Sequence, residues 1–596
     1  MTTTGTCIQR EMNLIIVDTD PEMDAVKDYL VADLAKIGIT LNVEVLPKEE
    51  YIAKETNGDF NMLFSRTWGA PYDPHSYFNS WEVPSHVEYS VLEGLEAPLT
   101  RDGLLAKIDD VQTTSDTMEV QTKWSEILND VHQQAIFAPL WGTRIPYVVN
   151  RRLSGFRPSD QTYSYPLSTV SVLEGEKIVT VAPGAGGAIF SQIGPIHPHQ
   201  YYPNQLFSQA WVYEGLVSYG QDGEITPALA KSWEVVGDAT GTQTATFTLR
   251  EGVKFHDGTD FNCTVAKLNF DHILHDSVKE RHAWCGTTQK LTSWECNEDG
   301  QFILKTDTEF YPLLQELTYI RPMTIVSAGA FANGVDSDPL LENSCNSGEF
   351  GSKYDYLEDT VTCAGLNGPY GSGPFKYVTK ETNADGIDTK VVFAKHDEYW
   401  GAEPGIEELH VVYYEDTDAV EKALMDESLD MALGIGPLTA LQVQNLKFYH
   451  SDKVDVRHSD IQQHSVLVMN TNMAPTDDID VRKAVIHAID KAEFVEKEFA
   501  GLEKSVYQTM PDAAPYCDID LNPKWNYDLE KATFLNCPLE SSSSSSSSEL
   551  SDGAIAGIAI GGIALVVLAM FTYNLISREK SGAPIFSPKK LDVEAV

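Results

Sequence analysis

The sequence lacks the short motifs that mark many enzyme active sites. It contains no HExxH pattern, no GxSxG nucleophile elbow and no phosphate-binding glycine loop. Gly371-Ser-Gly373 does not qualify as an elbow, because Pro374 follows directly and restricts the helix that an elbow requires. No CxxC pair is present, which disfavours a zinc knuckle and a thioredoxin-type redox site. We therefore predict that the chain is not an enzyme.

Positive charge is scarce. The 596 residues include 43 Lys and Arg against 88 Asp and Glu, so the formal net charge is −45. This balance argues against nucleic acid and anionic membrane surfaces as partners. Scattered acidic residues more often form a solvated surface than a cation site. With 42% apolar and 10% aromatic residues, the composition is that of a globular protein with room for several cores.

Cysteine is also sparse and unevenly placed. All of the eight cysteines except Cys7 lie between Cys263 and Cys537. Three pairs are close enough in sequence to close small loops, although spacing does not fix connectivity: Cys285/Cys296, Cys345/Cys363 and Cys517/Cys537. Asn262-Cys263-Thr264 is an N-glycosylation sequon. Disulfide bonds and a glycan would suit a glycoprotein of an oxidising compartment.

The C-terminal region has the features of a membrane anchor. Residues 541–552 begin with an unbroken serine run, which is typical of a flexible linker. Residues 554–576 carry no charge and are long enough to cross a bilayer as one helix. Arg578 and Lys580 follow, so the positive-inside rule places residues 577–596 in the cytoplasm. We expect a single-pass membrane protein with its large domain extracellular or lumenal.

This topology normally requires a signal peptide. Residues 1–12, MTTTGTCIQREM, contain no apolar h-region. We expect either an incomplete N-terminus or export by another signal.

The N-terminal region is predicted to form a βαβ unit. Leu14–Val17 is a short apolar strand, and residues 21–37 place apolar side chains at helical spacing. Gly38 ends this helix, and Ile39–Val45 alternates as a second strand. Such a unit predicts a sheet with a helix on its face.

A second local pattern lies around residue 255. Ala245–Leu249 alternates polar and apolar residues, Asp257-Gly258 is a strong turn signal, and Phe261 returns to the core. As a string, LREGVKFHDGTDF resembles the signature of the bacterial solute-binding proteins of family 5, which hand peptides, nickel complexes or related solutes to ABC importers. The resemblance implies an α/β fold of the periplasmic-binding-protein type II, in which two lobes close on a solute by a hinge.

The resemblance extends over two blocks in an unexpected order. Residues 177–540 resemble the N-terminal two-thirds of a family 5 domain, through the strings VYEGLV, LAKSWE, LREGVKFHDG, GSGPF, EYWG and VRKAVIHAID. Residues 10–172 resemble its C-terminal third, from DLAKIGITLNVEVL to FSRTWGAPYDPHSYF. The chain is therefore either a circular permutant or the end of a tandem array whose first copy is truncated.

The nickel-binding members are the most similar branch, and they imply a set of site residues. The implied ligand-binding residues are Arg281, Trp284, Arg321, Trp68, Tyr72, Tyr202 and Leu206, and the implied metal ligand is His86. Arginine suits this site because its planar fork pairs with the carboxylates of a metal chelator. Nickel-binding relatives carry methionine at the position of Leu206, so a thioether contact is absent here. For His197 and His199, which form an HxH pattern, the resemblance implies a structural role.

We therefore predict a membrane-anchored protein that captures a chelated transition metal, nickel above all, for transport. No tightly bound cofactor is expected, and the partners would be the metal chelate and an ABC-type permease. One alternative is an oligopeptide-binding receptor, since peptide-binding members use the same fold with a larger cleft. Another is a cell-surface recognition protein without a transport role, which the membrane anchor would also suit.

Overall fold

The computed structural model describes residues 8–536 with several gaps. The residues outside the description are 1–7, 19, 85, 186–187, 195, 200–204, 221–222, 239–240, 275–285, 332–351, 356–359, 364–367 and 537–596. The predicted linker, membrane helix and cytoplasmic tail therefore lie outside the described residues. Within residues 8–536, apart from those gaps, no helix has both the length and the apolar character needed to cross a bilayer. Met1–Pro538 forms one compact unit.

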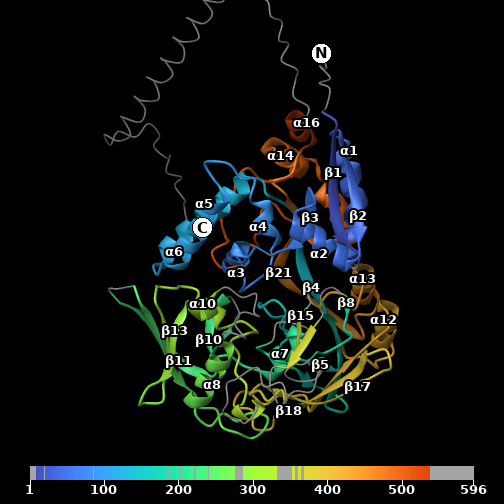
Figure 1. Ribbon diagram of the computed structural model, residues 1–596. Coiled ribbons are helices and arrows are strands. Elements are labelled where there is room, and N and C mark those ends of the chain that lie inside the picture. The colour runs from blue at the N-terminus through green and yellow to red at the C-terminus, as the bar shows by residue number, and fades with distance from the viewer. Residues whose placement is uncertain are drawn as a thin grey trace, which may run out of the picture. The chain divides into compact units, whose positions relative to one another are not determined.

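The predicted N-terminal βαβ unit is present. β1 (Arg10–Val17) pairs in parallel with β2 (Ile39–Leu46), and α1 (Pro21–Ala35) connects them (Figure 1). Asp20 caps α1 by accepting a hydrogen bond from a backbone N–H of its first turn. The helix buries one apolar row against the sheet, formed by Met23, Val26, Leu30 and Leu34.

One large mixed sheet contains strands from both blocks. It has 12 strands and follows the order β17-β18-β19-β7-β20-β4-β21-β3-β1-β2, with β22 on β4 and β8 on β7. The further bounds are β3 Met62–Arg66, β4 Phe137–Asn150, β7 Ile178–Ala185, β8 Ala188–Ile189, β17 Phe375–Thr382, β18 Asp388–Lys395, β19 Glu408–Val412, β20 Met431–Leu433, β21 Val454–Met469 and β22 Lys504–Ser505. Because β21 lies between β3 and β4, residues 10–172 and 177–536 are parts of one sheet.

The long strands β4 and β21 link two groups of hydrophobic cores. Figure 1 shows the two strands side by side, and they pair antiparallel along most of their length. Trp141 of β4 belongs to the core around β1 and β2, whereas Tyr147 of the same strand belongs to the core around β7 and β19. We call these groups the β1 lobe and the β7 lobe. The pairing register of β21 shifts at three places between His458 and Val466, which is where the strands pass from one lobe to the other.

Helices cover the sheet in both lobes. In the β1 lobe they are α1, α2 (Lys48–Asn57), α3 (His75–Asn79), η1 (Ser80–Glu82), α4 (Val87–Val91), α5 (Arg101–Gln112), α6 (Thr117–Gln133), α14 (Ile479–Ala488), α15 (Lys491–Glu498) and α16 (Leu529–Asn536). Those of the β7 lobe are α7 (Leu206–Val212), α12 (Thr417–Met425) and α13 (Ala440–Tyr449).

A smaller antiparallel sheet carries the strand of the signature string. Its order is β11 (Ala230–Gly237), β12 (Gln243–Leu249), β14 (Phe302–Thr306) and β13 (Leu291–Cys296). It shares a core with α8 (Cys263–Ile273) and α11 (Leu313–Glu316). The remaining short elements are β5 (Leu153–Ser154), β6 (Ser171–Val172), β9 (Val217–Tyr219), β10 (Ile225–Pro227), β15 (Ser352–Asp355), β16 (Thr360–Cys363), α10 (Thr287–Lys290) and η3 (Ala328–Ala330).

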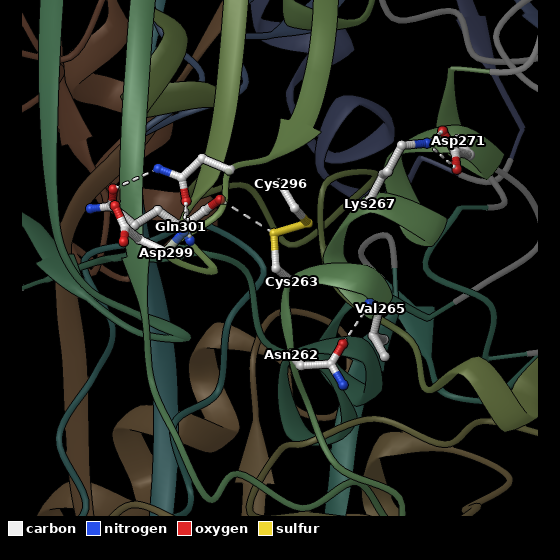
Figure 2. Close-up of a disulfide and its surroundings, with 9 residues drawn as sticks. Asn262, Cys263, Val265, Lys267, Asp271, Cys296, Asp299 and Gln301 are labelled. Carbon is white, nitrogen blue, oxygen red and sulfur yellow. Dashed lines mark hydrogen bonds and ion pairs between the residues drawn. A yellow bond between two sulfur atoms is a disulfide. The ribbon is translucent and has the colours of Figure 1, made fainter.

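A disulfide joins α8 to this sheet, and it differs from the pairs suggested by spacing. Figure 2 shows Cys263 bonded to Cys296, with 5.9 Å between their Cα atoms. The pairing of Cys296 with Cys285 is therefore wrong, because tertiary packing of α8 against β13 brings the more distant Cys263 to Cys296. Cys517 is a buried free thiol.

Arg152 holds the end of the segment that joins the two blocks. Arg152 forms an ion pair with Asp430 at 2.5 Å and donates to the carbonyl of Ile178 at 2.6 Å.

At the other end of the fold, the backbone N–H of Ile8 donates to the carbonyl of Asn536 at 3.3 Å. The first and last described residues are therefore neighbours in space.

The strings that carry the family resemblance converge on Glu214. Its carboxylate accepts hydrogen bonds from Ser372 Oγ at 2.7 Å, Trp400 Nε1 at 2.8 Å and Tyr399 Oη at 3.0 Å. Arg250 lies over the Trp400 ring, 4.1 Å from its centroid. Burial raises the pKa of Glu214 to about 7, although these hydrogen bonds oppose the rise. VYEGLV, GSGPF, EYWG and the signature string thus build one polar network.

The signature turn also holds the GSG loop. His256 lies within hydrogen-bonding distance of the Gly373 carbonyl, 2.9 Å from Nε2, and its backbone N–H donates to the Gly371 carbonyl at 2.9 Å. A Cβ at Gly371 would lie 1.9 Å from the Val212 carbonyl, so the close approach requires glycine. These strings serve the fold of the β7 lobe and its neighbouring sheet.

Candidate functional site

The turn before α3 presents the first predicted site residues. The buried carboxylate of Asp73 accepts hydrogen bonds from the backbone N–H groups of Trp68 at 2.9 Å and Gly69 at 2.8 Å. Gly69 has a φ of 81°, and a Cβ there would lie 2.2 Å from Thr162 Oγ1. Burial raises the pKa of Asp73 to about 6, while the two backbone hydrogen bonds oppose this rise. The turn therefore fixes the directions of Trp68 and Tyr72.

Three predicted residues meet in one aromatic cluster. The rings of Trp68 and His86 have centroids 6.4 Å apart. Tyr72 packs on Tyr319, with 4.5 Å between centroids, and Trp68 packs against this pair. The structure thus brings Trp68, Tyr72 and His86 together.

His86 is placed as a neutral imidazole. It is the residue before α4, and it is only partly exposed. Burial lowers the pKa of His86 below its ordinary value, so the imidazole is neutral at neutral pH and one of its ring nitrogens is unprotonated. A neutral imidazole is the form that binds a metal ion.

Arg321 lies next to this cluster in the chain. Tyr319 comes shortly before it, and the Tyr319 hydroxyl is 2.7 Å from Ser76 Oγ on α3. Arg321 itself is partly exposed. Tyr319 therefore connects the segment that carries the predicted carboxylate-binding arginine with the segment that carries Tyr72.

The other predicted site residues are not joined to this cluster by the described contacts. Leu206 is the first residue of α7 and is partly buried, and the helix packs into the core of the β7 lobe. Arg281, Trp284 and Tyr202 lie outside the described residues.

Sequence reasoning missed two tyrosines of the cluster. One is Tyr319, and the other is Tyr163, which has its ring centroid 6.2 Å from that of Tyr72. The Tyr163 hydroxyl accepts a hydrogen bond at 3.0 Å from Gln463 of β21, the strand that runs through both lobes. The only local signal for either residue is its place in an aromatic or arginine-bearing string, Gln-Thr-Tyr-Ser-Tyr or Tyr-Ile-Arg-Pro.

The HxH pattern lies in the interior. His197 and His199 are buried, and His199 Nδ1 is 2.9 Å from Nδ1 of the buried His272. His199 Nε2 lies 3.0 Å from the Thr324 carbonyl. Among the residues that the structure describes, no three His, Cys, Asp or Glu side chains are grouped so that they could hold a metal ion.

Comparison with known proteins identifies the family. The family profile of "Bacterial extracellular solute-binding proteins, family 5 Middle" matches residues 2–88 and 224–535. The nickel-binding periplasmic protein of Escherichia coli (strain K12) is 29% identical over 344 residues, which is 58% of each chain. The dipeptide-binding protein of the same strain is 24% identical over 320 residues, covering 52% of this chain and 54% of the relative.

Other relatives bind further kinds of ligand. Heme-binding protein A of Haemophilus influenzae is 24% identical over 334 residues, covering 54% of this chain and 56% of the relative. Among solved structures, NikA from Brucella suis in complex with Fe(III)-EDTA has 26% sequence identity and a TM-score of 0.47, with 60% of this chain and 63% of that chain covered. The chain therefore spans less than two thirds of the length of these relatives.

These relatives are binding proteins by name rather than enzymes, in agreement with the prediction from the missing motifs. The profile matches more than half of the chain, in both of its blocks. The chain belongs to the bacterial extracellular solute-binding proteins, family 5.

Proposed function

We propose that this protein is an extracytoplasmic receptor that captures a chelated transition metal, nickel above all, for uptake by an ABC-type permease. The observation that carries this proposal is the cluster of Trp68, Tyr72 and His86 beside the segment of Arg321. It combines an imidazole with aromatic rings, and one of these rings, Tyr319, lies two residues before Arg321 in the chain. The nickel-binding periplasmic protein of Escherichia coli, at 29% identity, supports the same ligand class.

Each group has a distinct role in this proposal. His86 would ligate the metal directly, because imidazole suits nickel and the pKa of His86 is lowered by burial. Arg321 and Arg281 would pair with the carboxylates of the chelator, which a planar guanidinium binds through two parallel hydrogen bonds. Trp68, Tyr72 and Trp284 would form the walls, with Tyr202 and Leu206 lining the site. A chelator would supply the remaining metal ligands.

Leu206 bears on the choice of metal. Leucine offers no thioether, so a soft contact at this position is absent from the chain. We therefore propose that capture depends on contacts with the chelator rather than on a sulfur contact with the metal. Similar chelates of other divalent metals would then compete with the nickel chelate for the site.

The two blocks would act as one binding unit. Residues 10–172 supply β1 to β4 and the Trp68–His86 segment, and residues 177–536 supply β21 and the Arg321 segment. Their shared sheet supports the proposal that the first block provides the final third of the same domain. The register shifts of β21 support a hinge at the crossing between the lobes.

We also propose that residues 554–576 anchor the receptor in a membrane, with the binding domain outside. Asn262 supports exposure to a glycosylating compartment, since it is exposed and follows the sequon pattern. Figure 2 shows its side chain capping α8, where Oδ1 accepts from the Val265 N–H at 3.1 Å. Its amide nitrogen would be the point of attachment.

Peptide capture is the second candidate. The dipeptide-binding protein of Escherichia coli is 24% identical to the chain over 320 residues, which favours this alternative specifically. Peptide capture would use the same lobes but would not need the imidazole of His86.

Titration calorimetry on residues 1–540 separates these functions. Nickel alone, nickel with excess free histidine and a pool of short peptides would be compared. We expect heat only when nickel and histidine are both present, and weaker binding in His86→Ala and Arg321→Ala. Binding of peptides alone would assign the protein to the peptide-binding members, and no binding by any of the three would contradict the proposal. Unchanged affinity in both variants would refute the proposed site.

A further inference from the structure

Glu316 is a buried carboxylate at the end of α11 that joins three chain segments. It is 1% exposed, and His75, its partner, is fully buried. Its Oε1 lies 2.5 Å from His75 Nε2. Its Oε2 accepts a hydrogen bond from the backbone N–H of Thr287. Both carboxylate oxygens are thus used, each by a different part of the chain.

These segments are the ones that carry the proposed ligand residues. His75 begins α3, directly after the turn of Trp68 and Tyr72. Thr287 begins α10, shortly after Arg281 and Trp284 in the sequence. Glu316 itself lies a few residues before Arg321 in the sequence. One side chain therefore ties the segment of Trp68 and Tyr72 to the start of α10 and to the segment that carries Arg321.

Gly286 gives independent support for a close contact at this point. A Cβ on Gly286 would lie 1.9 Å from Glu316 Oε1 and 2.3 Å from Oε2. Any other residue would push the carboxylate away from the Thr287 N–H. The sequence thus has a glycine where the approach of Glu316 leaves room for no side chain.

Apolar rings and further hydrogen bonds enclose the contact. The His75 ring lies edge-on to Phe310 and Tyr311, with centroids 5.8 and 6.0 Å apart. Gln315, next to Glu316, donates to the Pro71 carbonyl. In such a buried setting a hydrogen bond to a carboxylate is stronger, and its loss more costly, than at the surface.

We propose that Glu316 is a positioning residue, which fixes the Trp68–Tyr72 turn, the start of α10 and the Arg321 segment relative to one another so that one chelate can reach both the aromatic cluster and Arg321. This inference rests on the proposed function and extends it, because Glu316 acts through the segments it holds. Glutamine cannot replace it fully. The amide of glutamine has one oxygen that accepts and one nitrogen that donates, whereas His75 and Thr287 each direct an N–H donor at this side chain. His75 could accept only by moving its proton to Nδ1, and that atom is buried without a hydrogen-bond partner.

Two variants break the contact by different means. Glu316→Gln keeps the size of the side chain and removes one acceptor, whereas Gly286→Ala inserts a methyl group against the carboxylate. Glu295→Gln on β13 is the matched control, because Glu295 is half exposed and pairs with Lys305 at the surface. All three variants would be made in the full chain.

Hydrogen exchange without ligand provides the first test. In both variants we expect backbone exchange to quicken about tenfold at residues 71–80 and 286–291, since a hydrogen bond to a charged group is lost. Exchange in α16 should stay at the wild-type rate, as it should everywhere in Glu295→Gln. Unchanged protection in both segments would refute the proposal. Faster exchange throughout, α16 included, would also refute it and would show that Glu316 supports the fold as a whole.

Calorimetry with nickel and free histidine provides the second test. We expect Glu316→Gln to bind at least about tenfold more weakly than the Glu295→Gln control. Equal affinity in Glu316→Gln and Glu295→Gln would contradict the positioning role. If the wild type binds no nickel chelate, the proposed function fails, and the exchange experiment alone decides whether Glu316 holds the segments together.

Discussion

Glu214 is partly buried and Glu316 almost fully buried, and both carboxylates use each of their oxygens for hydrogen bonds. The partners of Glu214 are Ser372, Tyr399 and Trp400, which come from the strings that carry the family resemblance. The partners of Glu316 are His75, which lies in the resembling string FSRTWGAPYDPHSYF, and the backbone of Thr287, which lies in none of the quoted strings. The Glu214 network contains none of the predicted ligand residues, whereas the Glu316 network borders them.

This contrast indicates that the strings that identify the family stabilise the fold, whereas the proposed ligand residues lie elsewhere. The strings VYEGLV, GSGPF and EYWG are recognisable because a polar network at Glu214 requires those side chains and glycines at fixed places. In the proposed site, ligand choice would depend on a few residues such as His86 and Arg321. Breaking each network should therefore have a different consequence.

Replacing Glu214 should give the largest change in stability. Glu214→Ala leaves the donors of Ser372, Tyr399 and Trp400 without their acceptor, and we expect the free energy of unfolding to fall by about 3–5 kcal/mol. Urea denaturation followed by circular dichroism measures this loss. Affinity for the nickel chelate, measured on the fraction that stays folded, should change little. If Glu214→Ala were as stable as the wild type, the hydrogen bonds to Glu214 would not be needed to stabilise the fold.

Replacing Arg321 should have the opposite profile. Arg321→Ala removes the guanidinium proposed to pair with the chelator, so affinity for nickel with histidine should fall about 30–100-fold. The free energy of unfolding should stay within about 0.5 kcal/mol of the wild type, since Arg321 is partly exposed. Arg321→Lys serves as the control that keeps the charge without the planar fork. Equal affinity in all three proteins would place the chelator elsewhere.

The Glu214 network should also respond to pH. The pKa of Glu214 is raised from 4.5 to about 7 in the folded protein, so the folded state keeps a proton that the unfolded state has already released between these values. Its contribution to stability is therefore complete below about pH 4.5 and is lost as pH rises through 7. Between pH 5 and 8, the stability of the wild type relative to Glu214→Gln should decline by about 2–3 kcal/mol. A difference that does not vary with pH would contradict the raised pKa.

His86 should matter for the metal and hardly for the fold. His86→Ala should weaken capture of nickel with histidine about tenfold, because one of several metal ligands is lost. Glu295→Gln, whose carboxylate pairs with Lys305 at the surface, provides the control and should bind as the wild type does. Chemical denaturation should show nearly the same stability as the wild type. If metal capture were unchanged while stability dropped, His86 would belong to the core.

Local features of the fold could be predicted from the sequence. The βαβ unit at residues 10–46 and the turn at Gly258 follow from apolar spacing and from glycine, which act within a few residues. The pairing of Cys263 with Cys296 could not be predicted, because it depends on how α8 packs against β13. The order of strands in the large sheet likewise depends on contacts between the two blocks.

The candidate site divides in the same way. Trp68 and Tyr72 lie in one resembling string and His86 follows shortly after its end, so one stretch of sequence suggests all three. Tyr319, Tyr163 and Glu316 join them through contacts between distant residues, and the partner of Glu316 is 241 positions away. No local periodicity marks such residues, because their roles are set by tertiary packing.

The most direct test of the proposed capture of a metal chelate is anomalous diffraction at the nickel edge, from crystals grown with nickel and free histidine. We predict a single nickel peak within bonding distance of the His86 imidazole, with a carboxylate of the bound histidine facing Arg321. A nickel peak at the buried histidines around His199, or no peak beside His86, would contradict it.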